Sequence, residues 1–246
     1  MTIIEIDNLG HRFDDGTWGL KHVSLLIRKG AFVLIGGRNG SGKTTLLKHL
    51  NGLLLPDTGS VRLNGFQVSQ NLLRARQTVG MVFQDADSQI VGETVYDDVA
   101  FGPENLSLDR IEIKKRVSRA LHTVGLQDLA EQKPHLLSGG EKRRLAIAGV
   151  LAMEPEVLAL DEPFSNLDYP GIQQVLDQIL GLHANGSTII IAAHDLEMVI
   201  DHADRLVIMQ DGRVVRDGLP LEQMDALERF GIRVPYGFRR KVEMRS

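Results

Sequence analysis

The chain has 246 residues, of which 43% are hydrophobic and 24% are charged, and these proportions predict a globular protein with a buried core. Acidic residues outnumber basic ones, and the resulting net charge of −4 argues against a dedicated nucleic-acid-binding protein, so we expect no nucleic-acid partner. Cysteine is absent, which excludes disulfides and thiolate metal sites and suits a reducing compartment.

The sequence contains no segment that predicts membrane insertion. The first seven residues carry acids where a signal peptide carries lysines. The longest apolar run, at 145–153, is much shorter than the ~20 residues needed to cross a bilayer. We therefore expect a soluble chain, and any membrane-spanning part must come from another chain.

Two short strands are predicted near the N-terminus, at 3–7 and 23–27, with a turn at 14–16 between them. Phe13 and Trp18 flank that turn. We interpret Trp18 as a core or strand-face aromatic. Phe13 has two open interpretations, the same packing role or a ring that stacks on a nucleotide base.

A glycine-rich segment at 36–45 follows the apolar strand 31–35 and precedes a helix-forming stretch at 46–50. This is the context in which G-x-x-x-x-G-K-[ST] predicts a phosphate-binding loop rather than a glycine-rich hairpin, because backbone N–H groups and a helix N-terminus then face one anion. Lys43 is predicted to contact the β- and γ-phosphates, and the Thr44 hydroxyl to ligate Mg²⁺. The residues predicted to bind nucleotide here are Gly37, Arg38, Asn39, Gly40, Ser41, Gly42, Lys43, Thr44 and Thr45.

The middle of the chain changes character from strand to helix. Strands are predicted at 60–63 and 78–83, and the second ends at Gln84. From about 86 to 155 apolar residues recur at helical spacing, which predicts a helical insertion between strands of one sheet. Within it, Ser138 opens a helix that runs to about 153, with Glu141 placed for a capping box.

Two further buried strands end at polar residues. The run 156–160 stops at Asp161 and Glu162, and 188–193 stops at His194. We expect helices at about 171–182 and from 195 to 200, a strand pair at 206–209 and 212–215, and a poorly ordered tail over the last dozen residues.

Four predicted strands thus end at the phosphate loop, at Gln84, at the Asp161–Glu162 pair and at His194. The carboxyl ends of parallel strands share one edge, so these groups should meet there. Phosphoryl transfer needs charge neutralisation, bound Mg²⁺ and an oriented water. We assign Asp161 to Mg²⁺, Glu162 to deprotonating the water, His194 to the γ-phosphate, and Gln84 to the space between metal and water.

In this order the motifs make the chain resemble an ATP-binding cassette (ABC) ATPase along almost its whole length. The matching motifs are Phe13 (adenine-stacking aromatic), 37–44 (Walker A), Gln84 (Q-loop), Ser138-Gly139-Gly140 (signature), 158–162 (Walker B), Asn166-Leu167-Asp168 (D-loop) and His194 (switch histidine). The resemblance implies an α/β fold of the P-loop NTPase class, a RecA-like parallel sheet core with an N-terminal antiparallel β-subdomain and an inserted helical subdomain. It implies an ATPase domain at 1–232, with the helical subdomain at about 86–155, and a C-terminal tail at 233–246.

The signature turn is the most specific of these motifs, and in the family it implies a head-to-tail dimer with two ATPs at the interface. Each ATP then contacts the Walker A loop of one chain and Ser138, Gly139 and Gly140 of the other, with Asp168 at the same interface. Glu141, Asn166 and Phe13 differ from the commonest residues at their positions. None of these differences removes a catalytic group, so we expect an active Mg²⁺-dependent ATPase.

A narrower resemblance follows Gln84. The segments 89–91 and 98–106, and the residues after Gly140, are similar to the ATPases of energy-coupling-factor importers for cobalt, nickel and vitamins. This implies a groove after the Q-loop for a helix of an integral-membrane partner, and a peripheral position on the cytoplasmic side of the membrane. A soluble ATPase of iron–sulfur cluster assembly, or the ATPase of another ABC importer or exporter, is the alternative. A non-enzymatic regulator would lack Glu162 or His194, and both are present.

Overall fold

The computed structural model describes residues 1–236, in which the chain forms ten strands and seven α-helices. The strands are β1 (Thr2–Arg12), β2 (Trp18–Arg28), β3 (Phe32–Gly36), β4 (Thr58–Leu63), β5 (Phe66–Gln67), β6 (Val79–Val82), β7 (Val157–Asp161), β8 (Thr188–Ala193), β9 (Arg205–Gln210) and β10 (Arg213–Gly218). The helices are α1 (Lys43–Leu50), α2 (Leu72–Thr78), α3 (Val95–Asn105), α4 (Arg110–Thr123), α5 (Gly139–Leu151), α6 (Tyr169–Ala184) and α7 (Pro220–Gln223).

The central sheet has six strands in the order β10-β9-β3-β8-β7-β6. Neighbouring strands from β9 to β6 are parallel, and only β10 runs antiparallel at one edge. Every residue of β3, β7 and β8 is buried, as expected for a parallel sheet covered on both faces. The prediction that these strand ends share one edge of the sheet is therefore confirmed, because β3, β8, β7 and β6 are parallel neighbours.

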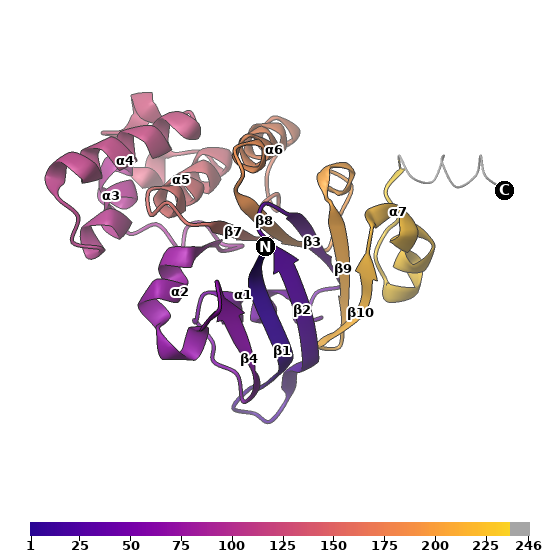
Figure 1. Cartoon of the computed structure of the whole chain (residues 1–246). Coiled ribbons are helices and arrows are strands. Elements are labelled where there is room, and N and C mark those ends of the chain that lie inside the picture. Colours follow the sequence, from indigo (N-terminus) through magenta and orange to yellow (C-terminus); the bar gives the residue numbers. More distant parts are fainter. Residues whose placement is uncertain (237–246) are drawn as a thin grey trace.

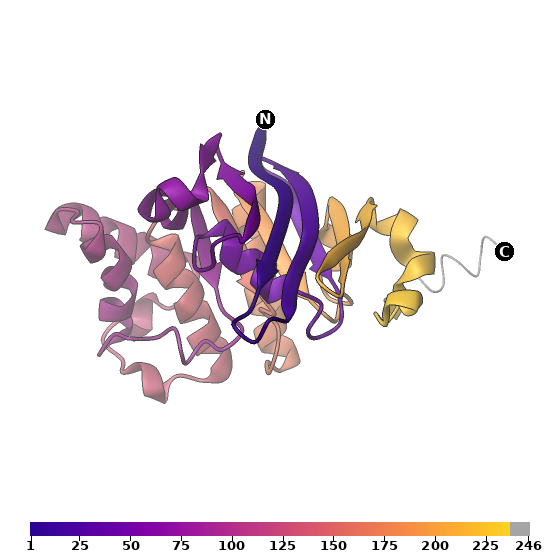
Figure 2. The same cartoon turned by 90° about the horizontal axis from the view of Figure 1, so that it is seen from below.

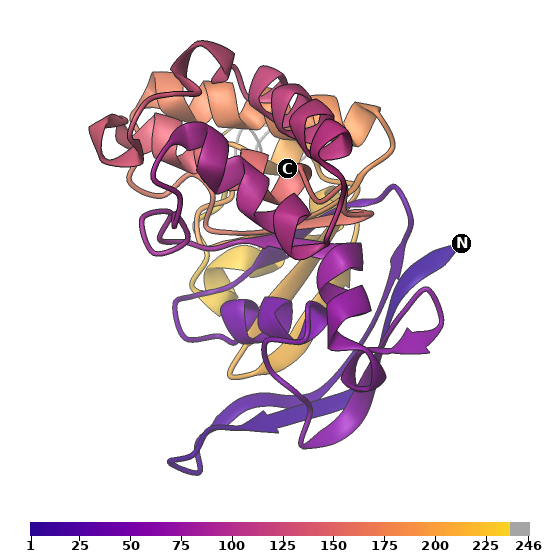
Figure 3. The same cartoon turned by 90° about the vertical axis from the view of Figure 1, so that its left-hand side faces the viewer.

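A second, antiparallel sheet with the order β2-β1-β4-β5 forms the N-terminal part of the described chain. In Figure 1 its strands lie below and in front of the central sheet, and Figure 3 shows them beneath the helices. Helix α1 contacts strands of both sheets, β7 and β8 on one side and β2 and β4 on the other. The helix that follows the phosphate loop is thus held between two layers.

The alternation of side chains along β3 divides the interior into two apolar clusters. Phe32 and Leu34 point into the cluster shared with α3, α4, α5 and α6. Val33 and Ile35 point into the cluster shared with β1, β2, β4 and α1. All four side chains are fully buried, so β3 is anchored from both faces just before the glycine-rich loop begins.

Helices α3, α4 and α5 form the expected insertion between β6 and β7. They gather at one side of the molecule, away from α7 (Figures 1 and 2). Each begins at a side-chain cap, from Thr94, Asp109 and Ser138, so their start points are fixed locally. The expected α/β architecture with its inserted helices is confirmed.

Two local predictions need correction, and one helix was not predicted. Helix α2 was not predicted, and it takes Thr78 from the predicted strand, so β6 begins at Val79. The prediction of a helix from 195 to 200 is wrong. Asp195 accepts a hydrogen bond from the Glu197 N–H, and the chain makes only a turn before a 3-10 segment at Ile200–His202.

The expected tail lies only partly within the described residues. Val234 is partly buried against the core, and the Tyr236 N–H donates to the Glu197 carboxylate at 2.8 Å. Residues 237–246 lie outside the described part, so the prediction of a poorly ordered end concerns residues that the structure does not describe.

Candidate active site

The phosphate loop needs glycine at two positions for different reasons. A Cβ on Gly37 would lie 2.6 Å from the Met209 carbonyl oxygen, so the backbone has no room for one. Gly42 has a φ of +104°, and a Cβ there would lie 2.9 Å from the Gly19 carbonyl oxygen. Gly42 is also the N-cap of α1 and offers no side-chain cap, which leaves the first N–H groups of the helix available to an anion.

Lys43 is nearly buried, with 6% of its side chain exposed, and its ammonium faces the loop. It donates to the Gly37 carbonyl at 2.8 Å and to the Arg38 carbonyl at 3.2 Å, and its Nζ lies 3.6 Å from Glu162 Oε1. Burial lowers the pKa of Lys43, and the carboxylates of Glu162 and Asp161 oppose this shift. The loop therefore already holds one cation at its centre.

Thr44 and Asp161 meet across the sheet edge. The Thr44 hydroxyl donates to Asp161 Oδ2 at 2.7 Å, while Asp161 Oδ1 is buried and has no hydrogen-bond partner among the described residues. Burial raises the pKa of Asp161, and the hydrogen bond from Thr44 opposes that rise. A hydroxyl beside a buried carboxylate oxygen without a partner is an oxygen donor set suited to Mg²⁺.

Glu162 and His194 come from neighbouring strand ends, β7 and β8. His194 Nδ1 lies 2.9 Å from Glu162 Oε1. Glu162 has a φ of +48°, the left-handed conformation that a glutamate rarely adopts, and its N–H donates to the Ala192 carbonyl of β8. The carboxylate is thus held between the Lys43 ammonium and the His194 ring.

Gln84 follows β6 and lines the same cavity as the phosphate loop. The strand before it is the edge of the sheet, and Gln89 covers that edge. Gln89 Oε1 accepts from the Phe83 N–H at 3.0 Å, and its amide donates to the Met81 carbonyl at 3.3 Å. The chain after Gln84 therefore folds back on the strand that it leaves.

A cavity of about 280 Å³ collects most of these groups, and both aromatics of the 14–16 turn line it. Phe13 and Trp18 are 43% and 40% exposed. Trp18 was interpreted as a core or strand-face aromatic; it lies on β2 and is not part of the core. Its ring lies against the Arg12 guanidinium, 4.4 Å from the ring centroid. Two aromatics around one turn beside the loop were the signal that could have identified Trp18. The cavity is lined by Phe13, Trp18, Gly19, Asn39, Gly40, Gly42, Lys43, Thr44, Thr45, Gln84 and Glu162.

Three of the predicted loop residues do not line this cavity. Gly37 and Arg38 contribute their carbonyls to Lys43 instead. Arg38 and Ser41 line a smaller cavity of about 150 Å³ behind the loop, beside Met209 and Phe230. The other residues predicted to bind nucleotide, Asn39, Gly40 and 42–45, all line the 280 Å³ cavity.

The signature residues and Asp168 lie outside this cavity within one chain. Ser138 caps α5, and Glu141 accepts from both its N–H and its hydroxyl at 2.7 Å. These bonds hold the pKa of Glu141 below its ordinary value. Asp168 caps α6 through the Gly171 N–H at 3.0 Å. The two caps fix the shape of the signature turn and of the loop before α6.

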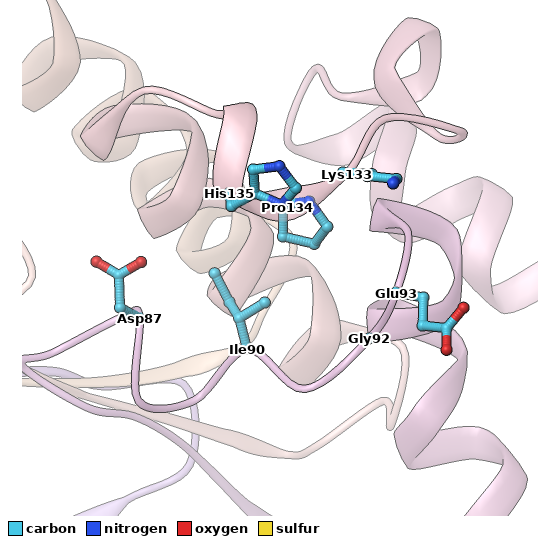
Figure 4. Close-up of a pocket in the computed structure, with 7 residues that line it drawn as sticks. All are labelled: Asp87, Ile90, Gly92, Glu93, Lys133, Pro134 and His135. Atoms are coloured by element: carbon cyan, nitrogen blue, oxygen red, sulfur yellow. The ribbon is translucent and has the colours of Figure 1, made fainter.

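Two further hollows lie beside the helical insertion. An apolar groove of about 300 Å³ runs between the outer side of β6 and helices α3 and α5. The apolar side chains that line it include Leu53, Met81, Phe83, Met153 and the exposed Val91 and Phe101. A hollow of about 430 Å³ lies between the segment after Gln84 and the turn before α5. In it Ile90 faces Pro134 and His135 (Figure 4). It is larger than the cavity at the phosphate loop but contains none of the predicted catalytic groups.

A family model described as ABC transporter matches residues 20–165, more than half of the chain, from the start of β2 to just past the Asp161–Glu162 pair. The chain belongs to the ABC transporter family. Within the described residues of this ABC protein, no helix is long and apolar enough to span a membrane.

Curated relatives of this ABC protein match it over nearly its whole length. The energy-coupling factor transporter ATP-binding protein EcfA of Methanocaldococcus jannaschii is 42% identical over 241 residues, which are 96% of this chain and 86% of that protein. The protein of the same name from Carboxydothermus hydrogenoformans is 44% identical over 235 residues, 94% of this chain and 87% of its own.

Solved structures of ABC ATPases have the same fold. The structure of cbiO1 from Clostridium perfringens, part of the ABC transporter complex cbiONQ, has a TM-score of 0.83 at 37% identity and covers 97% of this chain and 98% of its own. A dimeric ATP-binding cassette in a post-hydrolysis state with ADP and Pi has a TM-score of 0.79 at 27% identity, and the match covers 89% of this chain and 99% of that one. The resemblance to an ABC ATP-binding subunit of the energy-coupling-factor type is thus confirmed.

Proposed function

We propose that this chain is the Mg²⁺-dependent ATPase subunit of an energy-coupling-factor importer, which drives uptake of a metal ion such as cobalt or nickel, or of a vitamin. The observation that carries this proposal is the convergence of Lys43, the Thr44–Asp161 pair and the Glu162–His194 pair around one phosphate loop. The high identity to EcfA proteins over most of the chain supports the same assignment.

ATP binds with its phosphates on the loop and its base beside the two aromatics. The α1 N–H groups and Lys43 bind the phosphates, and Phe13 and Trp18 provide apolar surface for the base. Thr44 and Asp161 would hold Mg²⁺, with Gln84 at the same edge. The metal, when bound, neutralises negative charge on the phosphate oxygens.

Glu162 accepts the proton of the attacking water. Its carboxylate is oriented by two neighbours, Lys43 and His194, and its backbone bond to β8 limits where it can move. His194 is half exposed, so it can turn from Glu162 to the γ-phosphate when nucleotide enters. Binding of ATP also draws Lys43 from the Gly37 and Arg38 carbonyls towards the phosphates.

The second half of each site comes from another copy of the chain or from a paralogue. Ser138 and the two glycines after it lie outside the loop cavity of their own chain but form an exposed, rigidly capped turn. Such a turn suits contact with the γ-phosphate bound to a facing chain. The dimeric structure of a similar ATP-binding cassette with ADP and Pi supports this arrangement.

The membrane partner docks in the apolar groove beside β6. Phe101, which is 53% exposed, and Val91 present apolar surface there, and a groove of this kind suits an amphipathic helix. Docking of that kind places the chain peripherally on the cytoplasmic side of the membrane. The cargo is then selected by the membrane components.

The decisive experiment measures ATP hydrolysis of the purified complex with and without Mg²⁺. Glu162→Gln should lower turnover by about 100-fold or more while ATP remains bound, because the proton acceptor is lost but the phosphate contacts remain. Lys43→Ala should weaken ATP binding itself. Normal turnover in the Glu162→Gln variant would show that the base is assigned wrongly.

A pull-down from membranes tests the transport part of the proposal. The wild-type chain should recover a small integral-membrane protein, and Phe101→Asp should abolish that recovery while leaving ATP binding intact. Asp87→Asn, in the hollow of Figure 4, is the matched control outside the groove. Recovery of soluble scaffold proteins alone would instead favour iron–sulfur cluster assembly.

A further inference from the structure

Arg143 connects helix α5 to the backbone on either side of the Gln84 peptide. Its side chain leaves α5 inside the protein, where the residue is only 4% exposed. One guanidinium nitrogen donates to the Phe83 carbonyl and the other to the Gln84 carbonyl, both at 2.6 Å. Both bonds are short, and they join residues about 60 positions apart in sequence.

The geometry of this contact fixes the orientation of the backbone around Gln84. A guanidinium is a planar fork, and gripping two successive carbonyls fixes the direction of the peptides around Gln84. Burial lowers the pKa of Arg143, while the charges of Asp85 and Asp161 oppose that shift. Its Nε is buried with no partner among the described residues, so the Phe83 and Gln84 carbonyls are the hydrogen-bond acceptors that fix the guanidinium.

The same helix carries the signature turn at its start. Ser138 is the N-cap of α5, and Arg143 lies five residues later, about 8 Å along the helix axis. One rigid helix thus links the turn that faces a second chain to the backbone of a residue that faces ATP. Lys142 adds an exposed contact to Asp87 at 2.6 Å from the same helix.

We propose that Arg143 is a positioning residue that makes Gln84 and the signature helix move as one unit. The inference rests on the proposed role of Gln84 at the γ-phosphate. When that side chain shifts with the state of the nucleotide, the guanidinium carries the displacement to α5 and so to Ser138. Without Arg143, the glutamine and the helix respond separately.

The neighbouring arginine provides a matched control. Arg144 also leaves α5 and also donates to a backbone carbonyl, that of Val124 at 2.9 Å, but it contacts the end of α4 and not the Q-loop. Arg143→Met and Arg144→Met therefore remove similar side chains from adjacent positions. Arg143→Lys keeps the charge but loses the fork, and it serves if the methionine variant is poorly folded.

The expected result is a separation of kcat from KM in the full-length protein. Arg143→Met should lower kcat about 10-fold or more and change KM for ATP less than about 3-fold, because a misplaced Gln84 affects the reacting geometry more than binding. Arg143→Lys should lie between it and the wild type. Arg144→Met should keep kcat near the wild-type value even if its melting temperature falls.

A second readout follows the movement directly. In a Glu162→Gln background, ATP should protect both the Q-loop and the first turn of α5 from hydrogen exchange. In Arg143→Met the Q-loop should still respond, whereas the first turn of α5, which keeps only its contact with the facing chain, should be protected less than in Arg144→Met. Equal exchange responses in the Arg143→Met and Arg144→Met variants, or an Arg143→Met variant with wild-type kcat, would overturn the inference.

Failure of the inference is distinguishable from failure of the proposed function. Gln84→Ala tests the role of the glutamine alone. If Gln84→Ala loses turnover and Arg143→Met does not, the function stands and the coupling is refuted. If Gln84→Ala hydrolyses ATP normally, the assignment of Gln84 is wrong, and the coupling is refuted with it.

Discussion

Glu162 combines features at the residue scale that seldom occur together in a glutamate. It is nearly buried, it adopts a left-handed backbone conformation, and it lies between a lysine and a histidine. A conformation of this kind costs about 1–3 kcal/mol and persists only where the surroundings enforce it. Here the bond to the Ala192 carbonyl enforces it, and the result is a carboxylate aimed at the phosphate loop rather than along the strand.

Trp18 offers a direct report on nucleotide binding, since it is the only tryptophan of the chain and lines the loop cavity. Saturating ATP should shift its emission to shorter wavelength, because the ring loses contact with water. Phe13→Leu should weaken ATP binding about 10-fold while keeping the emission change at saturation. Trp18→Phe is the control that removes the tryptophan emission. Unchanged emission at ATP concentrations that equilibrium dialysis shows to be saturating would contradict the position of the base.

Most residues of the site could be predicted because each belongs to a local pattern. Lys43 and Thr44 are fixed by the glycine spacing, and Asp161 and Glu162 by the end of an apolar strand. Arg143 has no such pattern, since its partners lie about 60 residues away and only folding brings them together. Trp18 was expected to pack in the core or on a strand face, and its place beside the phosphate loop depends on how β1 and β2 pair.

The connection from β3 to α1 is the critical element of the fold. Its strand is buried on both faces and its helix is clamped between two sheets, so the loop between them has little freedom. We expect the loop to bind phosphate without a side-chain cap, because its glycines allow a turn that other residues cannot make.

Two glycines in this loop separate backbone strain from steric overlap. Gly42→Ala combines a φ of +104° with a Cβ 2.9 Å from a backbone oxygen, and should lower stability by about 1–3 kcal/mol and abolish ATP binding. Gly40→Ala has a φ of +80° but no atom within 4 Å of the added Cβ, so its loss should be smaller. Thermal melts with and without ATP compare them. Equal losses of stability in the two variants would mean that the close approach to the Gly19 carbonyl oxygen does not contribute to the destabilisation.

Element prediction succeeded for buried strands and failed where local hydrogen bonds compete. The apolar runs predicted at 156–160 and 188–193 can only form buried strands in a sheet covered on both faces, and the observed strands β7 and β8 lie within one residue of them. The segment after His194 has helical spacing, with Leu196, Val199 and Ile200 all buried. The Asp195 side chain nevertheless binds the Glu197 N–H, and the chain turns before a helix can extend.

For the whole molecule, the separation of signature turn and phosphate loop within one chain means that activity should depend on association. Specific activity should therefore rise with protein concentration, and Glu162→Gln with ATP should sediment as a dimer.

Mixing two inactive variants tests whether each ATP site combines the phosphate loop of one chain with the signature turn of another. Lys43→Ala loses the phosphate loop but keeps the signature turn, while Ser138→Arg does the opposite, so each alone should be inactive. Their mixture contains dimers with one complete site and should regain measurable turnover. A monodisperse monomer with full turnover, or a mixture as inactive as its components, would rule out the composite site.

The contact between Gln89 and β6 has a consequence for the time before any partner arrives. An edge strand beside an apolar groove is a template on which a second copy of the same strand can add, the first step towards aggregation. Gln89 occupies the Phe83 N–H and the Met81 carbonyl, the edge groups that an added strand would use. Its amide thus imitates a neighbouring strand, and a newly made chain can keep its groove uncovered without recruiting another copy.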